Sequence, residues 1–151
     1  MSIQIKYIRE GRSQEFAPGT TLAEMAEAFD KSLRKKALCA LVNGKTVDLA
    51  IQLNEDAEVD FLTFEDAKGK DVYRHSCSHI MAQAVKRLYP DTKIAIGPAI
   101  ADGFYYDFDT VKPFTPDTLA EVTREMENII RENLPVSRFE LSRQEAIKFF
   151  A

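Results

Sequence analysis

The stretch IQIKYIREGRSQEFAPGTTLAE, residues 3–24, decides the fold of the first part of the chain. Apolar and polar residues alternate over residues 3–8, which is typical of a half-buried strand, and the chain returns as a second strand over 13–16. Thr21 and Glu24 then predict a capping box, because the threonine oxygen can accept the Glu24 backbone N–H while the carboxylate reaches back. A strand hairpin followed by a capped helix therefore opens the domain.

The segments that follow complete a β-rich unit with one helix. Apolar residues at helical spacing predict a helix that continues to Phe29. Asn43-Gly44 separates two short strands, and this dipeptide favours a two-residue hairpin because both positions tolerate positive φ. A last strand is expected over residues 59–64. This order predicts a β-grasp fold over residues 1–62, of a size that suits a binding module, and the polar residues 63–70 are expected to be a linker.

The second part, residues 71–151, is also expected to be α+β. A helix is predicted over about 71–89, ended by Pro90. Short strands are expected over 93–96 and 104–108. Tyr105 and Tyr106 would then point to opposite faces, so that one of them is offered to a cleft or to solvent.

Two further helices are predicted near the end of the chain. Thr115 caps the first, with Pro116 at its opening position, and Pro135 ends it before an extended segment over 136–141. Ser142 and Glu145 predict another capping box, whose helix still runs at the last residue, so the chain looks cut rather than finished. The buried stripe of the first helix is expected to consist of Leu119, Val122, Met126, Ile129 and Ile130.

Composition bounds the class of protein. The 151 residues are 45% hydrophobic and 29% charged, as in a globular chain, with a net charge of −4 that argues against non-specific coating of nucleic acid driven by overall charge. No apolar run is long enough to cross a bilayer, and neither a signal peptide nor a disulfide framework is visible, which favours the cytoplasm. The densest basic run, KSLRKK at 31–36, is interpreted as a solvated loop or helix end, or as a phosphate contact.

His75 and His79 are the only two histidines, and their spacing places both imidazoles on one face of the predicted helix. They can converge on a ligand, a metal or a water, or they can simply hydrogen-bond within the fold. A zincin would need glutamate directly after the first histidine, where Ser76 stands. Zinc normally takes at least three protein ligands, and no histidine or cysteine follows His79, so a stand-alone metal hydrolase is disfavoured.

Four motifs in this order resemble the N-terminal region of bacterial threonyl-tRNA synthetases, over essentially the whole chain. They are RHSCSH at 74–79, LYP at 88–90, KIAIGP at 93–98 and GFYYD at 103–107. The resemblance implies that residues 1–62 are a TGS domain. It also implies that residues 71–151 are the first part of the editing domain, which is truncated here.

The resemblance also implies the chemistry of the site. In the family, an editing site hydrolyses seryl-tRNA(Thr) with a His-x-x-x-His pair, which His75 and His79 match, and a tyrosine that Tyr106 matches. Gly97 and Gly103 are expected to allow close approach of the substrate or of another backbone segment. The family's later Cys-x-x-x-His pair is absent, and only with it would the two histidines become metal ligands.

What the resemblance implies for cofactors and partners concerns mainly the parent enzyme. ATP, magnesium and zinc would serve an aminoacylation domain that this chain lacks, and the parent is expected to be a homodimer through that domain. The chain itself is expected to need no cofactor, to be monomeric, and to bind neither a membrane nor DNA, while the acceptor end of tRNA(Thr) is the expected partner in the parent. The alternative is a non-catalytic TGS module that binds RNA or a protein regulator.

Overall fold

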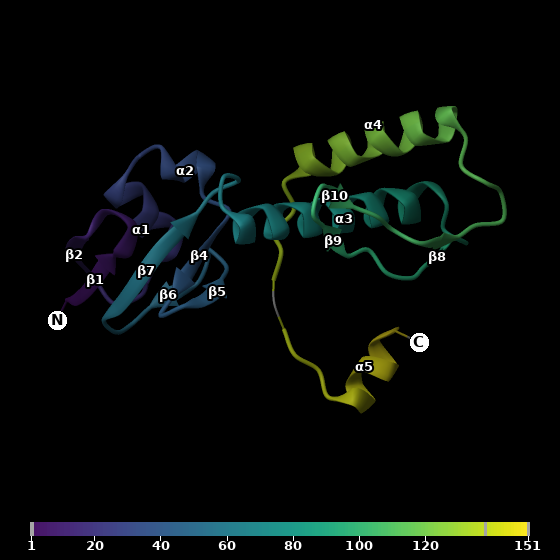
Figure 1. Ribbon diagram of the computed structural model, residues 1–151. Coiled ribbons are helices and arrows are strands. Elements are labelled where there is room, and N and C mark those ends of the chain that lie inside the picture. Colours follow the sequence, from purple (N-terminus) through teal and green to yellow (C-terminus); the bar gives the residue numbers. More distant parts are fainter. Residues whose placement is uncertain (1, 138, 151) are drawn as a thin grey trace.

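The first unit is a five-stranded mixed sheet with helices on one side (Figure 1). The computed structural model describes residues 2–137 and 139–150. Its sheet order is β2-β1-β7-β4-β5, in which β1 runs parallel to β7 and every other neighbouring pair is antiparallel. The strands are β1 Ile3–Tyr7, β2 Arg12–Phe16, β4 Cys39–Val42, β5 Lys45–Val47 and β7 Ala57–Leu62. The predicted β-grasp order and the α+β class are confirmed.

Helix α1 (Leu22–Phe29) covers this sheet and buries Leu22, Met25, Ala26 and Phe29 in the core. The predicted capping box is present: the Glu24 backbone N–H donates to Thr21 Oγ1 at 3.3 Å, and the Thr21 N–H donates to the Glu24 carboxylate at 2.8 Å. Apolar burial stabilises the unit. The fully buried large residues at its centre are Ile5, Leu22, Met25, Val59 and Phe61.

Several short elements connect these parts. Asn43 and Gly44 take φ values of 48° and 82°, as the predicted hairpin turn requires. The basic run forms a short helix, α2 (Leu33–Lys36), in which Leu33 is buried and the three basic residues are exposed. The remaining elements of the unit were not predicted: the 3₁₀ helix η1 Ile8–Glu10, and the paired strands β3 Thr20–Thr21 and β6 Gln52–Leu53.

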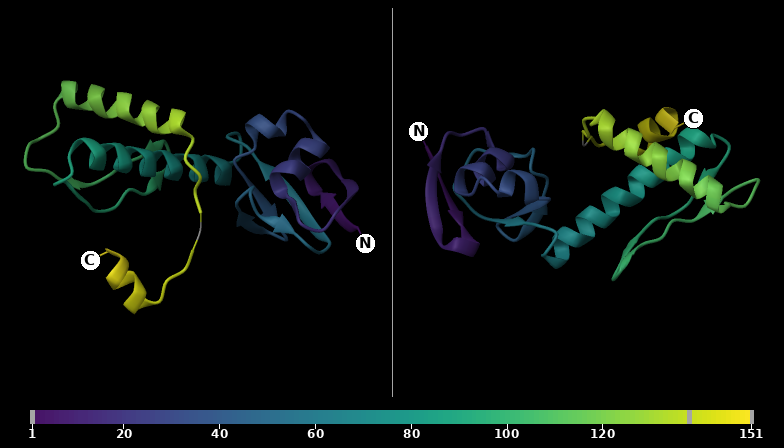
Figure 2. Two further views of the ribbon diagram at one scale, coloured as in Figure 1. Left: turned by 180° about the vertical axis from the view of Figure 1, so that it is seen from behind. Right: turned by 90° about the horizontal axis from the view of Figure 1, so that it is seen from above.

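Helix α3 (Ala67–Leu88) begins earlier than predicted and projects from the first unit into the second (Figures 1 and 2). Residues 67–70, expected to be linker, form its first turn. Asp66 precedes the helix, and its carboxylate accepts the Thr63 backbone N–H at 2.8 Å. A β-carbon at Gly69 would lie 1.9 Å from the Thr63 carbonyl oxygen, so only glycine lets the helix pack this closely on the end of β7.

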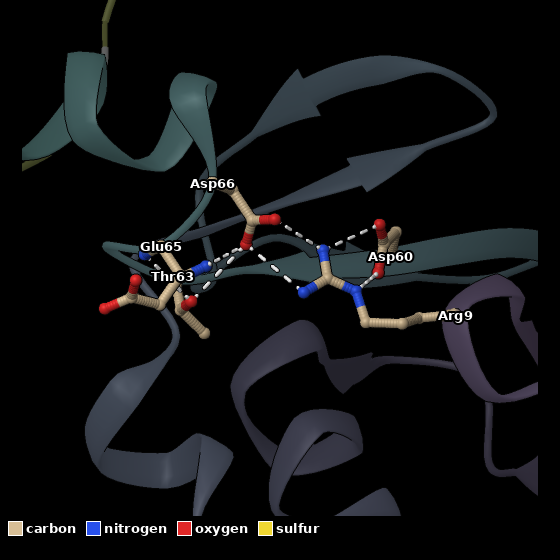
Figure 3. Close-up of polar contacts among 5 residues, drawn as sticks. All are labelled: Arg9, Asp60, Thr63, Glu65 and Asp66. Carbon is tan, nitrogen blue, oxygen red and sulfur yellow. Dashed lines mark hydrogen bonds and ion pairs between the residues drawn. The ribbon is translucent and has the colours of Figure 1, made fainter.

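Arg9 joins the two sides of this boundary (Figure 3). Its guanidinium donates to both carboxylate oxygens of Asp60, at 3.0 and 3.1 Å. It also donates to both oxygens of Asp66, at 3.3 and 2.9 Å. The first unit therefore holds the residue that starts α3 through a paired, bidentate contact, the geometry for which arginine is best suited.

The second unit consists of α3, helix α4 (Pro116–Glu132) beside it, and a long β-hairpin between them in the sequence. The single strand expected over 104–108 is wrong: residues 105–107 lie between two short strands. Ile94 pairs with Phe108 but Ala99 pairs with Phe104, so the first strand has one extra residue between the two ladders. The hairpin strands are β8 Lys93–Ile94, β9 Ala99–Ile100, β10 Gly103–Phe104 and β11 Phe108–Asp109.

Helix α4 starts as predicted but buries less than expected. Thr115 Oγ1 accepts the Thr118 backbone N–H at 3.3 Å, and Pro116 follows it. Val122 and Ile129 are buried against α3. The prediction that Leu119 and Ile130 are buried is wrong, since they are 55% and 59% exposed, because no described element packs on their side of the helix.

The last helix, α5 (Arg143–Phe150), lies apart from the rest of the molecule (Figure 1). Its capping box is confirmed, with the Glu145 carboxylate 2.9 Å from the Ser142 backbone nitrogen. The expected extended segment over 136–141 includes Arg138, and the expected helix end is Ala151; both residues lie outside the described part. Among the described residues, no helix is long and apolar enough to cross a membrane.

Candidate functional site

His75 and His79 converge on one face of α3, as their spacing predicts. Their Nε2 atoms lie 3.0 Å apart, and the ring planes meet at 89° with centroids 4.5 Å apart. Two imidazole nitrogens at this distance can share a hydrogen bond only if one carries the proton and the other offers its lone pair. The pair therefore presents a donor and an acceptor, and both rings are exposed to solvent.

A buried hydroxyl ties the histidine turn to the hairpin. Ser78 is fully buried, and its Oγ lies 2.8 Å from the His75 carbonyl oxygen and 3.0 Å from the Gly97 carbonyl oxygen. A hydroxyl has one hydrogen, so Ser78 donates to one of these acceptors at a time. The contact holds the turn of α3 that carries His75 against Gly97, which lies in the part of the hairpin where the strand register changes.

Gly97 and Tyr106 are in direct contact across the hairpin. A β-carbon at Gly97 would lie 2.0 Å from Cδ2 of the Tyr106 ring, so the ring rests on the glycine backbone. Tyr106 also stacks on Phe108, with centroids 4.8 Å apart and planes at 14°. Tyr106 is half-buried whereas Tyr105 is exposed, the split that strand alternation predicts. The close approach at Gly97 is thus made by a side chain of the chain itself.

The tip of the hairpin is held by Arg74, a residue of the same helical turn. Its guanidinium donates to the backbone carbonyls of Ile100 and Ala101. Gly103 lies beside this tip, paired with Ile100, and the position of its absent β-carbon is open. No pattern along the sequence indicates what Arg74 and Ser78 do, because both bond to a segment 19 to 27 residues further along the chain.

Cys77 lies on another face of α3 from the two histidines. It neighbours Tyr73, and the charge of a Cys77 thiolate, together with a hydrogen bond to it, raises the pKa of Tyr73. Within residues 2–137 and 139–150, no three or more His, Cys, Asp or Glu side chains are grouped to hold a metal ion.

Two cavities lie elsewhere in the molecule. One, of about 410 Å³, lies between the end of α3 and residues 110–118; the other, of about 490 Å³, lies between α2 and the start of α3. Neither is lined by His75, His79 or Tyr106. The histidine pair therefore occupies an open face rather than either of these cavities.

Comparisons with known proteins agree with the fold. Residues 3–63 match the family model described as TGS domain. The chain is 53% identical over 143 residues, 95% of its length, to a threonine–tRNA ligase of Desulforamulus reducens. It is 56% identical over 137 residues, 91% of its length, to one of Carboxydothermus hydrogenoformans, and 50% identical over 142 residues, 94% of its length, to one of Clostridium novyi.

The match covers one part of those relatives. The chain spans 22% of the length of each of these three proteins. At about half identity over nearly the whole chain, with the sheet order of the first unit as observed, common ancestry is the only reasonable explanation. Over the part that it matches, the chain is therefore similar to threonine–tRNA ligases, and residues 3–63 of its first unit match the TGS domain.

Proposed function

We propose that the chain is the N-terminal part of a threonine–tRNA ligase and carries half of a site that hydrolyses seryl-tRNA(Thr). The observation that carries this proposal is the 3.0 Å contact between the Nε2 atoms of His75 and His79. Supporting it are the similarity to threonine–tRNA ligases and the contacts that hold the histidine turn against Gly97 and Tyr106. Charging with threonine, with its ATP, magnesium and zinc, would be the task of another part of the ligase.

A hydrolytic site answers a physical need of such an enzyme. Threonine and serine differ by one methyl group, which an apolar contact discriminates by only about 10–200-fold. A pocket that accepts threonine must also accept the smaller serine. Mischarged tRNA therefore has to be removed afterwards, by cleaving the ester that joins serine to the terminal ribose.

The geometry supports a division of roles between the two rings. The imidazole that donates its Nε2–H to the other ring keeps a free lone pair on Nδ1, and this nitrogen accepts a proton from the attacking water, whose oxygen forms a bond with the ester carbonyl carbon. The bond from that carbon to the ribose oxygen then breaks, and the ribose oxygen takes up a proton, giving serine and a free tRNA hydroxyl. The second imidazole positions the water or the neighbouring ribose hydroxyl, while Tyr106 and nearby backbone amides orient the ester.

The exposure of the two histidines affects how much hydrolysis is expected from this chain by itself. Both imidazoles are exposed, so water has free access and the ester has no enclosing wall among the described residues. Electrostatic stabilisation of the transition state is weak in such a setting. We therefore expect little or no hydrolysis from residues 1–151 by themselves, and the second wall has to come from another part of the ligase.

The test is deacylation of seryl-tRNA(Thr) by the protein encoded by the complete reading frame. His75→Ala and His79→Ala are expected to lower the hydrolysis rate by about 10²–10⁴-fold, the usual contribution of a general acid or base. Ser76→Ala is the matched control, because Ser76 is exposed on the same turn and its hydroxyl, among the described residues, bonds only to the Val72 carbonyl. The rate of charging with threonine reports whether each variant is folded.

Two outcomes separate the candidates. Loss of hydrolysis with normal charging supports the assignment of both histidines. Unchanged hydrolysis in both histidine variants overturns it and leaves the similarity to threonine–tRNA ligases intact. In that case, the remaining candidate is a module that binds RNA or a protein regulator without taking part in catalysis.

A further inference from the structure

A second candidate site lies where the TGS domain meets α3. Its cavity of about 490 Å³ is lined by Lys35 and Lys36 of α2, by Phe64 and Glu65 just before α3, and by Tyr73 of α3. We call this the junction cleft. Its volume lies within the range of ligand sites in proteins, and none of its lining residues takes part in the histidine site.

Two exposed aromatic rings stand together in the cleft. Phe64 and Tyr73 are 45% and 47% exposed, although large aromatic side chains are usually buried. Their centroids lie 5.2 Å apart with planes at 81°, so the edge of one ring meets the face of the other. Such an arrangement leaves ring surface open to a flat ligand.

The charges around the rings favour an anion. Lys35 and Lys36 are exposed, and neither forms an ion pair with a described residue, whereas the adjacent Arg34 is paired with Glu27 at 2.8 Å. Outside the lining, the Lys70 ammonium lies 5.8 Å from the centroid of the Phe64 ring. The two lining lysines, Lys35 and Lys36, outnumber the single lining acid, Glu65, so the charge of the lining is opposite to the net charge of −4 of the whole chain.

The α3 side of the cleft is held to the first unit. Arg9 bridges Asp60 of β7 and Asp66 at the start of α3, and Gly69 lets the first turn of α3 pack on Thr63. The cleft therefore exists before any ligand arrives, which lowers the cost of ordering it on binding.

We propose that the junction cleft binds an unpaired segment of RNA, with a base stacked on Phe64 or Tyr73 and phosphates on Lys35 and Lys36. Aromatic rings beside lysines are the chemistry of single-strand recognition, because every base has a face that stacks and every nucleotide carries a phosphate. The choice of RNA as the polyanion rests on the proposed function. A duplex hides the faces of its bases, so it cannot use the rings.

The phosphate contacts are tested by salt dependence. Binding of the whole chain to a fluorescein-labelled single-stranded RNA of about twelve nucleotides is followed by anisotropy between about 50 and 300 mM salt. The double variant Lys35→Gln/Lys36→Gln is expected to reduce the slope of log Kd against log salt by about 1.4. Lys45→Gln/Lys112→Gln removes the same charge from exposed lysines elsewhere and is expected to leave the slope unchanged.

The stacking contacts are tested with ring-to-aliphatic variants. Phe64→Leu and Tyr73→Leu are each expected to weaken single-strand binding about tenfold, the loss of a stacked base. Phe149→Leu is the matched control, because Phe149 is also an exposed ring in edge contact with another ring. Circular dichroism of each variant confirms that the fold is retained.

Three results would overturn the junction cleft as an RNA site. They are equal binding of a duplex of the same length, equal slopes for the two double-lysine variants, and unchanged affinity in both Phe64→Leu and Tyr73→Leu. Seryl-tRNA hydrolysis depends on other residues and is measured separately. Either proposal can therefore fail while the other stands.

Discussion

Replacing Arg9 by alanine tests whether the first unit and the start of α3 are joined by the bridge that the structure contains. The change removes four contacts of 2.9–3.3 Å to two carboxylates. It also leaves Asp60 and Asp66, whose side chains are 20% and 25% exposed, close together without their counter-charge.

The expected loss of stability is moderate. Charge-assisted bidentate bonds are strong in isolation, but the Arg9 side chain is 40% exposed, so solvent screening reduces their net value. We estimate about 1–2 kcal/mol, which corresponds to a fall in the melting temperature of roughly 4–15 °C for a domain of this size. Arg9→Lys keeps the charge but cannot form bidentate bonds to both carboxylates, so its stability is expected to lie between those of wild type and Arg9→Ala.

The pH dependence of this difference follows from Asp66. Burial by itself raises the pKa of Asp66, but the bonds from the Thr63 backbone and from Arg9 outweigh it, so the pKa lies below its ordinary value. A carboxylate with a lowered pKa stabilises the fold above its unfolded value of about 3.9, and this stabilisation is lost as the pH falls through the folded value. The difference in unfolding free energy between wild type and Arg9→Ala should therefore persist from pH 7 to about pH 4 and become smaller below pH 4.

The assay is urea-induced unfolding followed by circular dichroism, at several pH values for wild type, Arg9→Ala and Arg9→Lys. Asp66→Asn adds a useful comparison, since the amide oxygen can still accept the Thr63 N–H. It should lose the ion pair with Arg9 and keep the bond from Thr63. The bridge would be shown not to join the two parts by an Arg9→Ala variant as stable as wild type at pH 7, or by a difference in stability that does not change below pH 4.

Substitutions at three further positions have expected outcomes, which thermal unfolding measures unless another assay is given. Gly97→Ala places a β-carbon 2.0 Å from the Tyr106 ring, which must move, so a loss of about 1–3 kcal/mol is expected, with weaker seryl-tRNA hydrolysis in the full-length protein. Gly69→Ala meets the Thr63 carbonyl oxygen at 1.9 Å and should fray the first turn of α3, seen as faster amide exchange there. Ser78→Ala removes a buried donor and should cost about 1–3 kcal/mol, whereas Ser78→Thr tests whether the hydroxyl alone suffices.

Much of the first unit could be predicted because its local signals coincide with its tertiary structure. The alternation of apolar and polar residues predicted β1, the capping box predicted α1, and Asn43-Gly44 predicted the hairpin of β4 and β5. The paired strands β3 and β6 have two residues each, too short for any periodicity to indicate them.

The early start of α3 could not be predicted from local sequence. Residues 63–71 are polar and lack helical periodicity, and the helix begins where Arg9 holds Asp66, a contact between residues far apart in the chain. The exposure of Leu119 and Ile130 could not be predicted from local sequence either. Periodicity indicates which residues share a face of α4, but not whether another element covers that face.

For the histidine site, spacing predicted the convergence of the two rings but not what holds them. The attachments of Ser78 to Gly97 and of Arg74 to the hairpin tip depend on how the hairpin folds back onto α3. The one-residue bulge that brings Gly97 under Tyr106 depends on the same packing. Each is a tertiary contact, and no pattern along the chain specifies it.

The most direct test of the account is the tautomeric state of the two histidines, read from ¹H–¹⁵N correlation spectra of the ¹⁵N-labelled chain at a pH where both rings are neutral. The chain has two histidines, so its ring signals are few and can be assigned with His79→Gln. A shared hydrogen bond between the Nε2 atoms requires one ring protonated at Nε2 and the other at Nδ1, and this is the predicted result. Two rings both protonated at Nε2 would contradict it.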